Sequence, residues 1–160
     1  MSDAQLTRYD RRMQAIMNRR EAAPLYATAA RRRTVVAVHV LLTAASVASW
    51  GRHPFVLLAL LLPWCVATGA INAATRGLLE LRRRALDERQ RAERSEVLAR
   101  AHRITTGLLL VTVLGVGGYA MAGGDLTGVV LPVLLGALVA HWLMPMWVAG
   151  LRAQDEPDDE

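Results

Sequence analysis

The chain has 160 residues, of which 53% are hydrophobic and 5% aromatic, and this length suits one domain. All 19 basic residues are Arg and the formal net charge is +5, but the Arg residues flank long apolar blocks, which is typical of membrane proteins rather than of nucleic-acid-binding proteins. The single cysteine, Cys65, lies inside an apolar run, which excludes an internal disulfide and a cysteine-based metal cluster.

Residues 1–33 are predicted to form a cytoplasmic or interfacial segment with an amphipathic helix. Ser2 and Gln5 have the spacing of a capping box. Apolar residues then share one face of the helix, namely Leu6, Tyr9, Met13, Ile16 and Met17. Such a helix either lies in the membrane interface or packs against the protein's own cytoplasmic parts. The segment lacks the apolar stretch of a signal peptide, so we expect the first span to direct insertion.

Four apolar blocks follow, each close to the roughly 20 residues that a helix needs to cross a membrane. They cover residues 34–50, 55–75, 104–122 and 128–149. Short turns join them in pairs. The sequence therefore predicts an all-α integral membrane protein with four transmembrane helices, arranged as hairpins over residues 34–75 and 104–149. Residues 150–160 form an acidic tail that should be disordered.

Residues 76–103 are predicted to form a charged cytoplasmic helical segment. The second span should continue to Leu86, and a new helix should start at Glu88 and run into the third span. The break is placed near Asp87, because Asp87 and Gln90 have the spacing of a capping box. The leucines from Leu78 to Leu86 are expected to pack against Val97, Leu98 and Ala101, which leaves a charged tip between them.

The distribution of Arg residues predicts the orientation. Eighteen of them precede the first span, lie in residues 76–103 or follow the fourth span, whereas Arg52 alone lies in an outer turn. The use of Arg without any Lys indicates a GC-rich bacterial genome. The positive-inside rule then places both termini in the cytoplasm, with the spans in the bacterial inner membrane. The chain can also be divided into two units of the same orientation, about 2–75 and 76–150. Each unit consists of a charged helix followed by a membrane hairpin.

Three polar residues lie within the predicted spans, His39, Asn72 and His141. An ionisable group inside a membrane is a functional candidate. A neutral His can instead form a hydrogen bond between helices, and the alternatives are a proton relay or metal binding. Asn72 can likewise join helices through a hydrogen bond. Its alternative role is catalytic.

The run HWLMPMW, residues 141–147, combines His141 with Met144 and Met146. Imidazole and thioether groups suit Cu(I). The alternative is an interfacial anchor, with Trp142 and Trp147 at headgroup depth.

Small residues recur at four-residue spacing in the spans and predict close helix approach and homo-oligomers. The pairs are Gly69 with Ala73, Gly118 with Ala122 and Gly136 with Ala140. The chain has no phosphate loop, no HExxH or GxSxG motif and no paired carboxylates inside the spans. These observations predict no enzyme and no cofactor.

The segment LDERQRAERSEVLARAHRI resembles a group of small, uncharacterised four-span bacterial membrane proteins. Their mark is a DER-type motif before the third span, here Asp87, Glu88 and Arg89. The resemblance covers this motif and the layout of spans. It supports the topology and implies no activity.

The leading functional hypothesis is a small inner-membrane scaffold or accessory subunit. It would bind a protein partner, or a second copy, through the predicted partner-binding residues Asp87, Glu88, Arg89, Arg91 and Arg94. The expected surroundings are the lipid bilayer and its anionic headgroups. One alternative is an oligomeric transporter or channel lined by the three intramembrane polar residues. A membrane enzyme would need a bound cofactor or lipid near His141.

Overall fold

A computed structural model describes residues 7–17, 23–50 and 53–153 of the chain, and every secondary-structure element in these residues is helical. The elements are α1 (Arg8–Met17), α2 (Ala23–Tyr26), α3 (Ala29–Ser49), α4 (Pro54–Ala74), the short 3-10 helix η2 (Arg83–Ala85), α5 (Glu88–Met121) and α6 (Val130–Arg152). The all-α prediction is confirmed. The predicted cap at Ser2 and residues 154–160 of the acidic tail lie outside the described residues.

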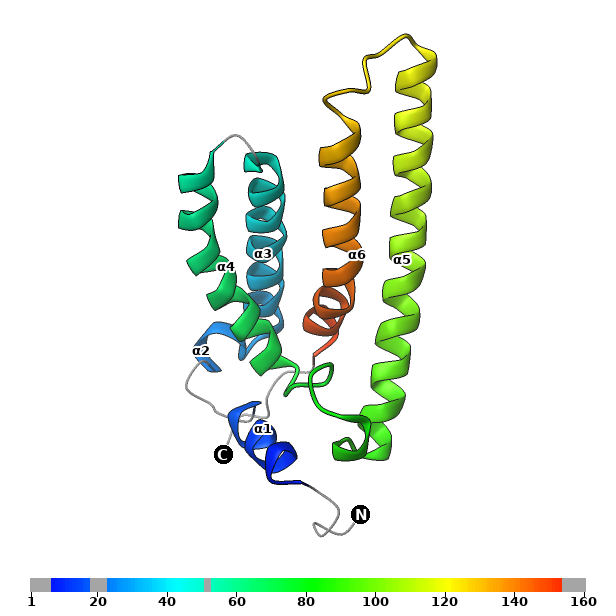
Figure 1. Cartoon of the computed structure of the whole chain (residues 1–160). Helices are drawn as coiled ribbons and strands as arrows, with labels where there is room; N and C mark the ends of the chain where they lie inside the picture. The colour runs from blue at the N-terminus through cyan, green and yellow to red at the C-terminus, as the bar shows by residue number, and fades with distance from the viewer. Residues whose placement is uncertain (1–6, 18–22, 51–52, 154–160) are drawn as a thin grey trace.

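The four long helices form two hairpins that meet along α6. Helix α3 packs against α4, α5 packs against α6, and α6 also contacts α3 and α4. In Figure 1, α6 accordingly lies between the α3–α4 pair and α5. We call the lower end of this view the charged end, formed by α1, residues 75–87, the first turns of α5 and the last turn of α6.

Three helices, α4, α5 and α6, are long and apolar enough to cross a membrane. The prediction of four such helices is therefore wrong by this measure, and α3 is the one that falls short. This helix starts at Ala29 rather than at Thr34, so its first turns include Arg31 to Arg33. The polar His39 follows within the same helix.

Helix α4 ends at Ala74, and the prediction that it continues to Leu86 is wrong. The amide of Gly77 donates a hydrogen bond to the carbonyl of Asn72 over 3.0 Å. Both Arg76 (φ 51°) and Gly77 (φ 69°) have left-handed backbone conformations. This pattern is a Schellman motif, which closes a helix and turns the chain away from its axis. Glycine adopts this conformation at no steric cost, whereas arginine adopts it rarely.

Helix α5 begins as the sequence predicts. The Asp87 carboxylate accepts a hydrogen bond from the Gln90 amide over 2.7 Å, and the Gln90 side-chain oxygen accepts one from the Asp87 amide over 3.1 Å. The complete capping box fixes the first turn. The helix then runs without interruption for 34 residues, so residues 88–103 of the predicted charged segment and the third predicted span form one continuous helix.

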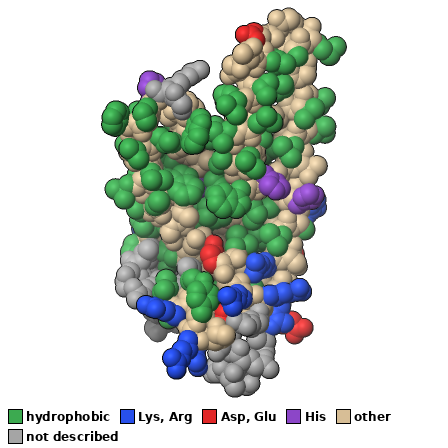
Figure 2. All heavy atoms as spheres, in the orientation of Figure 1, with side chains coloured by type: hydrophobic (Ala, Val, Ile, Leu, Met, Phe, Trp, Pro, Cys, Tyr) green, Lys and Arg blue, Asp and Glu red, His purple; other side chains and the backbone are tan. Residues whose placement is uncertain are grey.

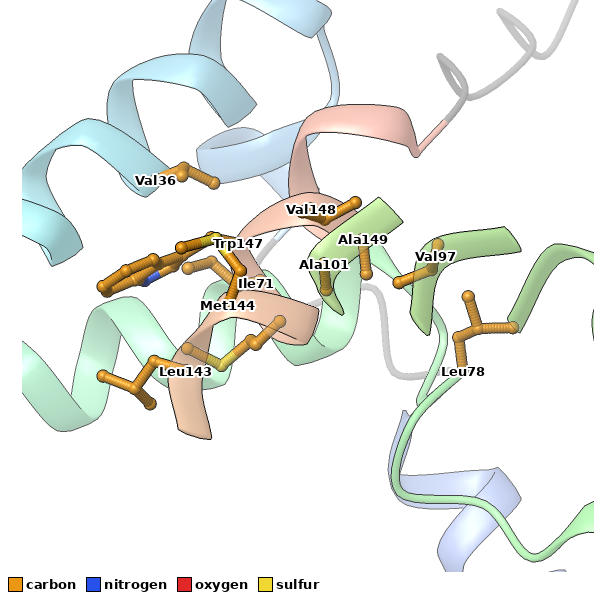
Figure 3. Packing of buried hydrophobic residues seen from close by; sticks show 11 residues of the cluster. Val36, Ile71, Leu78, Val97, Ala101, Leu143, Met144, Trp147, Val148 and Ala149 are labelled. Carbon is orange, nitrogen blue, oxygen red and sulfur yellow. The ribbon is translucent and has the colours of Figure 1, made fainter. Parts of the chain in front are cut away.

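The main hydrophobic core lies toward the charged end, where α4, α5 and α6 converge with the start of α3 (Figure 3). Its buried members are Val36, Ile71, Leu78, Val97, Ala101, Leu143, Met144, Met146, Trp147, Val148 and Ala149. The predicted packing of Leu78–Leu86 against Val97, Leu98 and Ala101 holds only in part. Leu78 shares the main core with Val97 and Ala101, whereas Leu81 and Leu86 are buried in a separate cluster and Leu98 is 43% exposed.

A second cluster attaches α1 to the charged end. Leu81, Ala85 and Leu86 are buried together, and Met13 of α1 packs against them. Gln14 of α1 also donates a side-chain hydrogen bond to the carbonyl of Ala85 over 3.1 Å. Met13 and Gln14 therefore pack against the protein's own charged segment, whereas Tyr9 and Ile16 of the predicted apolar face are 54% and 46% exposed.

Polar contacts reinforce this attachment. Asp10 is 1% exposed and accepts a 2.7 Å hydrogen bond from the Thr7 hydroxyl at the start of α1. The Arg82 guanidinium lies 4.0 Å from the Asp10 carboxylate and 5.1 Å above the centre of the Tyr9 ring. These contacts fix α1 against the segment that follows α4.

Away from the charged end the helices bury little of their apolar surface within the chain. Only 6% of the apolar stretch of α5, 17% of that of α4 and 22% of that of α6 is buried. On the face shown in Figure 2, apolar side chains cover the upper part and Arg side chains gather at the lower end. An apolar surface of this extent needs hydrocarbon or another protein around it.

Candidate functional site

His39 lies at the centre of a polar network that joins α3, α4 and α6. Its side chain is 0% exposed. The indole N–H of Trp147 donates to Nδ1 of His39 over 2.9 Å. The other ring nitrogen, Nε2, lies 2.9 Å from the Thr68 hydroxyl oxygen. One imidazole therefore connects α3 with the next helix, α4, and with the distant helix α6.

The partners determine which nitrogen carries the proton. An indole N–H can only donate, so Nδ1 of His39 must be the bare acceptor. The Thr68 hydroxyl donates to the carbonyl of Trp64 over 2.9 Å, so it accepts from Nε2–H. The Thr43 hydroxyl donates to the His39 carbonyl over 2.8 Å and accepts from the Trp64 indole over 2.9 Å. The network assigns a neutral imidazole with its proton on Nε2.

This network is closed on itself. Every polar side-chain group of the network has a partner within the chain. These groups are the indole N–H groups of Trp64 and Trp147, the hydroxyls of Thr43 and Thr68, and both ring nitrogens of His39. Protonation of Nδ1 would bring two N–H donors face to face. The arrangement therefore suits an interhelical connection and does not suit a proton relay. Within the described residues, no group of three or more His, Cys, Asp or Glu side chains could hold a metal ion.

The other two intramembrane candidates do not join this network. The His141 side chain is exposed on α6. Asn72 lies near the end of α4, and its side-chain oxygen is buried without a hydrogen-bond partner among the described residues. The three residues predicted to line a transport path are thus in three different environments.

The predicted Cu(I) set is also separated. Met144 and Met146 are both buried in the main core, whereas His141 is exposed. The alternative of an interfacial anchor fits Trp142, which is 78% exposed. It does not fit Trp147, which is buried and bonded to His39.

Three of the five predicted partner-binding residues have structural roles at the charged end. Asp87 caps α5. The Arg91 Nε–H donates to the carbonyls of Arg83 and Leu86 over 3.1 and 3.0 Å. Arg94 donates from Nη1 to the carbonyl of Leu81 over 2.8 Å. These bonds hold residues 75–87, which include the short helix η2, against α5. The other two, Glu88 and Arg89, have exposed side chains on the first turn of α5.

Between this segment and α5 lies a groove of about 580 Å³. We call it the Arg groove, because four of its lining residues are Arg82, Arg83, Arg91 and Arg94. Glu80 also lines it, and loss of water around its carboxyl raises the pKa of Glu80. Backbone hydrogen bonds and the charge of Arg94 oppose this shift without cancelling it.

Among the glycines of the long helices, Gly150 has the closest neighbours on other helices, and it was not in a predicted small-residue pair. A methyl group at Gly150 of α6 would lie 2.9 Å from Ile71 Cγ2 and 3.0 Å from Val36 Cγ2. A methyl group at Gly69 or Gly118 would meet nothing within 4 Å, and one at Gly136 would lie 3.7 Å from Val47. Close packing inside the chain therefore depends on Gly150.

Sequence reasoning also missed most of the network around His39. A signal was present, because His39 and Thr43 are four residues apart on one helix and Trp64 and Thr68 are four residues apart on the next. Residues with this spacing share a helix face, so two polar pairs on adjacent helices could have been matched.

No family model, curated protein or solved structure matches this chain. The resemblance to four-span proteins with a DER-type motif stays a prediction.

Proposed function

We propose that this chain is a small integral protein of a bacterial inner membrane and acts as a scaffold or accessory subunit. Its apolar helices would anchor it in the bilayer, and the charged end would bind a protein partner on the cytoplasmic side. The resemblance of Asp87, Glu88 and Arg89 to a DER-type motif supports the choice of this surface.

Packing at the charged end supports a fourth membrane crossing by α3. Met13 and Gln14 of α1 contact the segment that follows α4, so both segments lie on the same side of the membrane. With α4 across the membrane, a crossing by α3 would bring the chain back to that side. The two helices have equal lengths of 21 residues, and the polar His39 is shielded from lipid by its bonds to α4 and α6. The excess of Arg at the charged end then favours a cytoplasmic location for that end.

The proposal rests mainly on the position of Glu88 and Arg89 on a helical turn whose backbone is fixed. Both side chains are exposed on a turn fixed by the capping box, and the bonds from Arg91 and Arg94 hold the neighbouring segment. Exposed charges stabilise a fold by about 1 kcal/mol at most. Such charges act mainly by fixing the orientation of a bound partner and by excluding wrong partners.

The transporter or channel alternative has no supporting observation among the described residues. Self-association is compatible with the scaffold role, since a methyl group added to any of several glycines of α5 would meet nothing within 4 Å, as at Gly107, Gly115 and Gly118. A second helix could approach α5 closely at these positions.

Affinity purification in mild detergent tests the scaffold role. We expect the double variant Glu88→Ala/Arg89→Ala to lose most of a copurifying protein while its thermal stability stays within about 1 kcal/mol of the parent. The matched control is Glu96→Ala/Arg152→Ala, which removes an ion pair of 2.8 Å between α5 and α6 and changes the net charge equally. Equal copurification with parent and both variants would contradict the proposal.

A further inference from the structure

We propose that the Arg groove binds a phosphate group, carried either by the headgroup of an anionic phospholipid or by a free phosphorylated small molecule. The groove would do so whether or not Glu88 and Arg89 also bind a protein.

Charge is the first support. Four Arg residues and one Glu residue line the groove, so its lining carries an excess of positive charge. The Asp10 carboxylate lies 4.0 Å from Arg82 and offsets part of the charge of that residue. Glu80 interacts with Arg94 and offsets part of the charge of that residue as well, and Arg83 adds to the positive charge that is left. Guanidinium groups bind phosphate oxygens through paired, charge-assisted hydrogen bonds.

Preorganisation is the second support. Arg91 and Arg94 extend from the rigid helix α5, and their hydrogen bonds to the carbonyls of Leu86 and Leu81 fix both side chains before any ligand arrives. Fixed side chains lose less conformational freedom on binding. A guanidinium has five N–H donors, and the bond to Leu81 occupies one of those on Arg94.

The position of the groove explains why both phosphate sources are considered. Its lining includes the apolar Leu79 and Leu98. Leu98 precedes Ile104, the start of the apolar part of α5, by six residues, which is about 9 Å along a helix. Arg91 is thirteen residues from Ile104, or about 20 Å. The groove therefore extends from headgroup depth into the cytoplasmic layer beside the membrane.

Binding to the full-length protein in a non-ionic detergent at low salt tests the proposal. The probes are inorganic phosphate, dioctanoyl phosphatidylglycerol and, as the zwitterionic control, dioctanoyl phosphatidylcholine. We expect Arg83→Gln to weaken binding of a phosphate probe about tenfold, because it removes a charge-assisted contact. We expect Glu80→Gln to strengthen it, because it removes the negative charge from the groove.

The matched control is Arg100→Gln. Arg100 is exposed on α5 and does not line the Arg groove, so this variant loses the same charge at another place. Binding of the phosphatidylglycerol alone would identify the lipid headgroup as the source, and binding of inorganic phosphate as well would identify a free ligand. Either result supports the proposal if Arg83→Gln weakens binding and Arg100→Gln changes it less than about twofold. Equal weakening by the two variants, equal binding of phosphatidylcholine, or no binding at all would overturn it.

Discussion

Replacing His39 with Ala is expected to lower the free energy of unfolding in detergent by about 2–4 kcal/mol. The substitution opens a cavity at a fully buried position. It also leaves the Trp147 indole N–H without its acceptor and the Thr68 hydroxyl without its donor. Each lost hydrogen bond inside a membrane protein contributes about 0.6–1.7 kcal/mol, and the cavity supplies the rest. Denaturation monitored by Trp fluorescence gives the measurement.

The control is His141→Ala, the same chemical change at an exposed position of α6. We expect it to leave stability within about 0.5 kcal/mol of the parent. The pair of variants also separates a structural role from transport. Equal stability of the two variants, together with loss of a proton flux in His39→Ala alone, would contradict the closed network.

Replacing Gly150 with Leu should be similarly destabilising, by about 1–3 kcal/mol or more, because overpacking forces neighbouring helices apart. The first side-chain carbon at position 150 would lie 2.9 Å from Ile71 Cγ2 and 3.0 Å from Val36 Cγ2. Both of these side chains are β-branched and buried, so they have little freedom to move. A thermal unfolding assay in detergent should show a lower midpoint.

Gly107→Leu is the matched control for overpacking. A methyl group at Gly107 meets nothing within 4 Å inside the chain, so the unfolding midpoint of a monomer should be unchanged or higher. A midpoint for Gly150→Leu equal to that of Gly107→Leu would show that α6 does not approach α3 and α4 as closely as described.

Local signals in the sequence predicted their structures well. The capping box at Asp87 and Gln90 needs only residues that are three apart, and it sets the start of α5 as expected. The apolar blocks likewise located α4, α6 and the end of α5 within a few residues, because the length of a crossing is set by the thickness of the bilayer. The common burial of Leu78 and Val97 was predictable as well, because a turn between the two residues brings them into one core.

Features that depend on the backbone of a single residue or on distant partners were not predictable in this way. Helix α4 ends early because Arg76 adopts a left-handed conformation, which propensity does not indicate for arginine. The bond between His39 and Trp147 joins residues 108 positions apart. Arg91 and Arg94 have structural roles because α4 ends early. The backbone carbonyls of the segment after α4 can then accept hydrogen bonds from these two side chains. The sequence identified His39 and these Arg residues as notable but could not distinguish their packing roles from binding roles.

The most direct test of the central claim is cysteine accessibility in whole cells, in a Cys65→Ala background with one new cysteine per variant. All four positions have exposed side chains. An impermeant maleimide added from outside should label His53→Cys and Asp125→Cys, and it should reach Ala15→Cys and Ala92→Cys only after lysis. This pattern means that α3 crosses the membrane and that the charged end is cytoplasmic. Labelling of both Ala15→Cys and His53→Cys from outside, with Ala92→Cys protected, would show that α3 does not cross. The reverse pattern at all four positions would place the charged end, with its groove and its exposed tip, outside the cell.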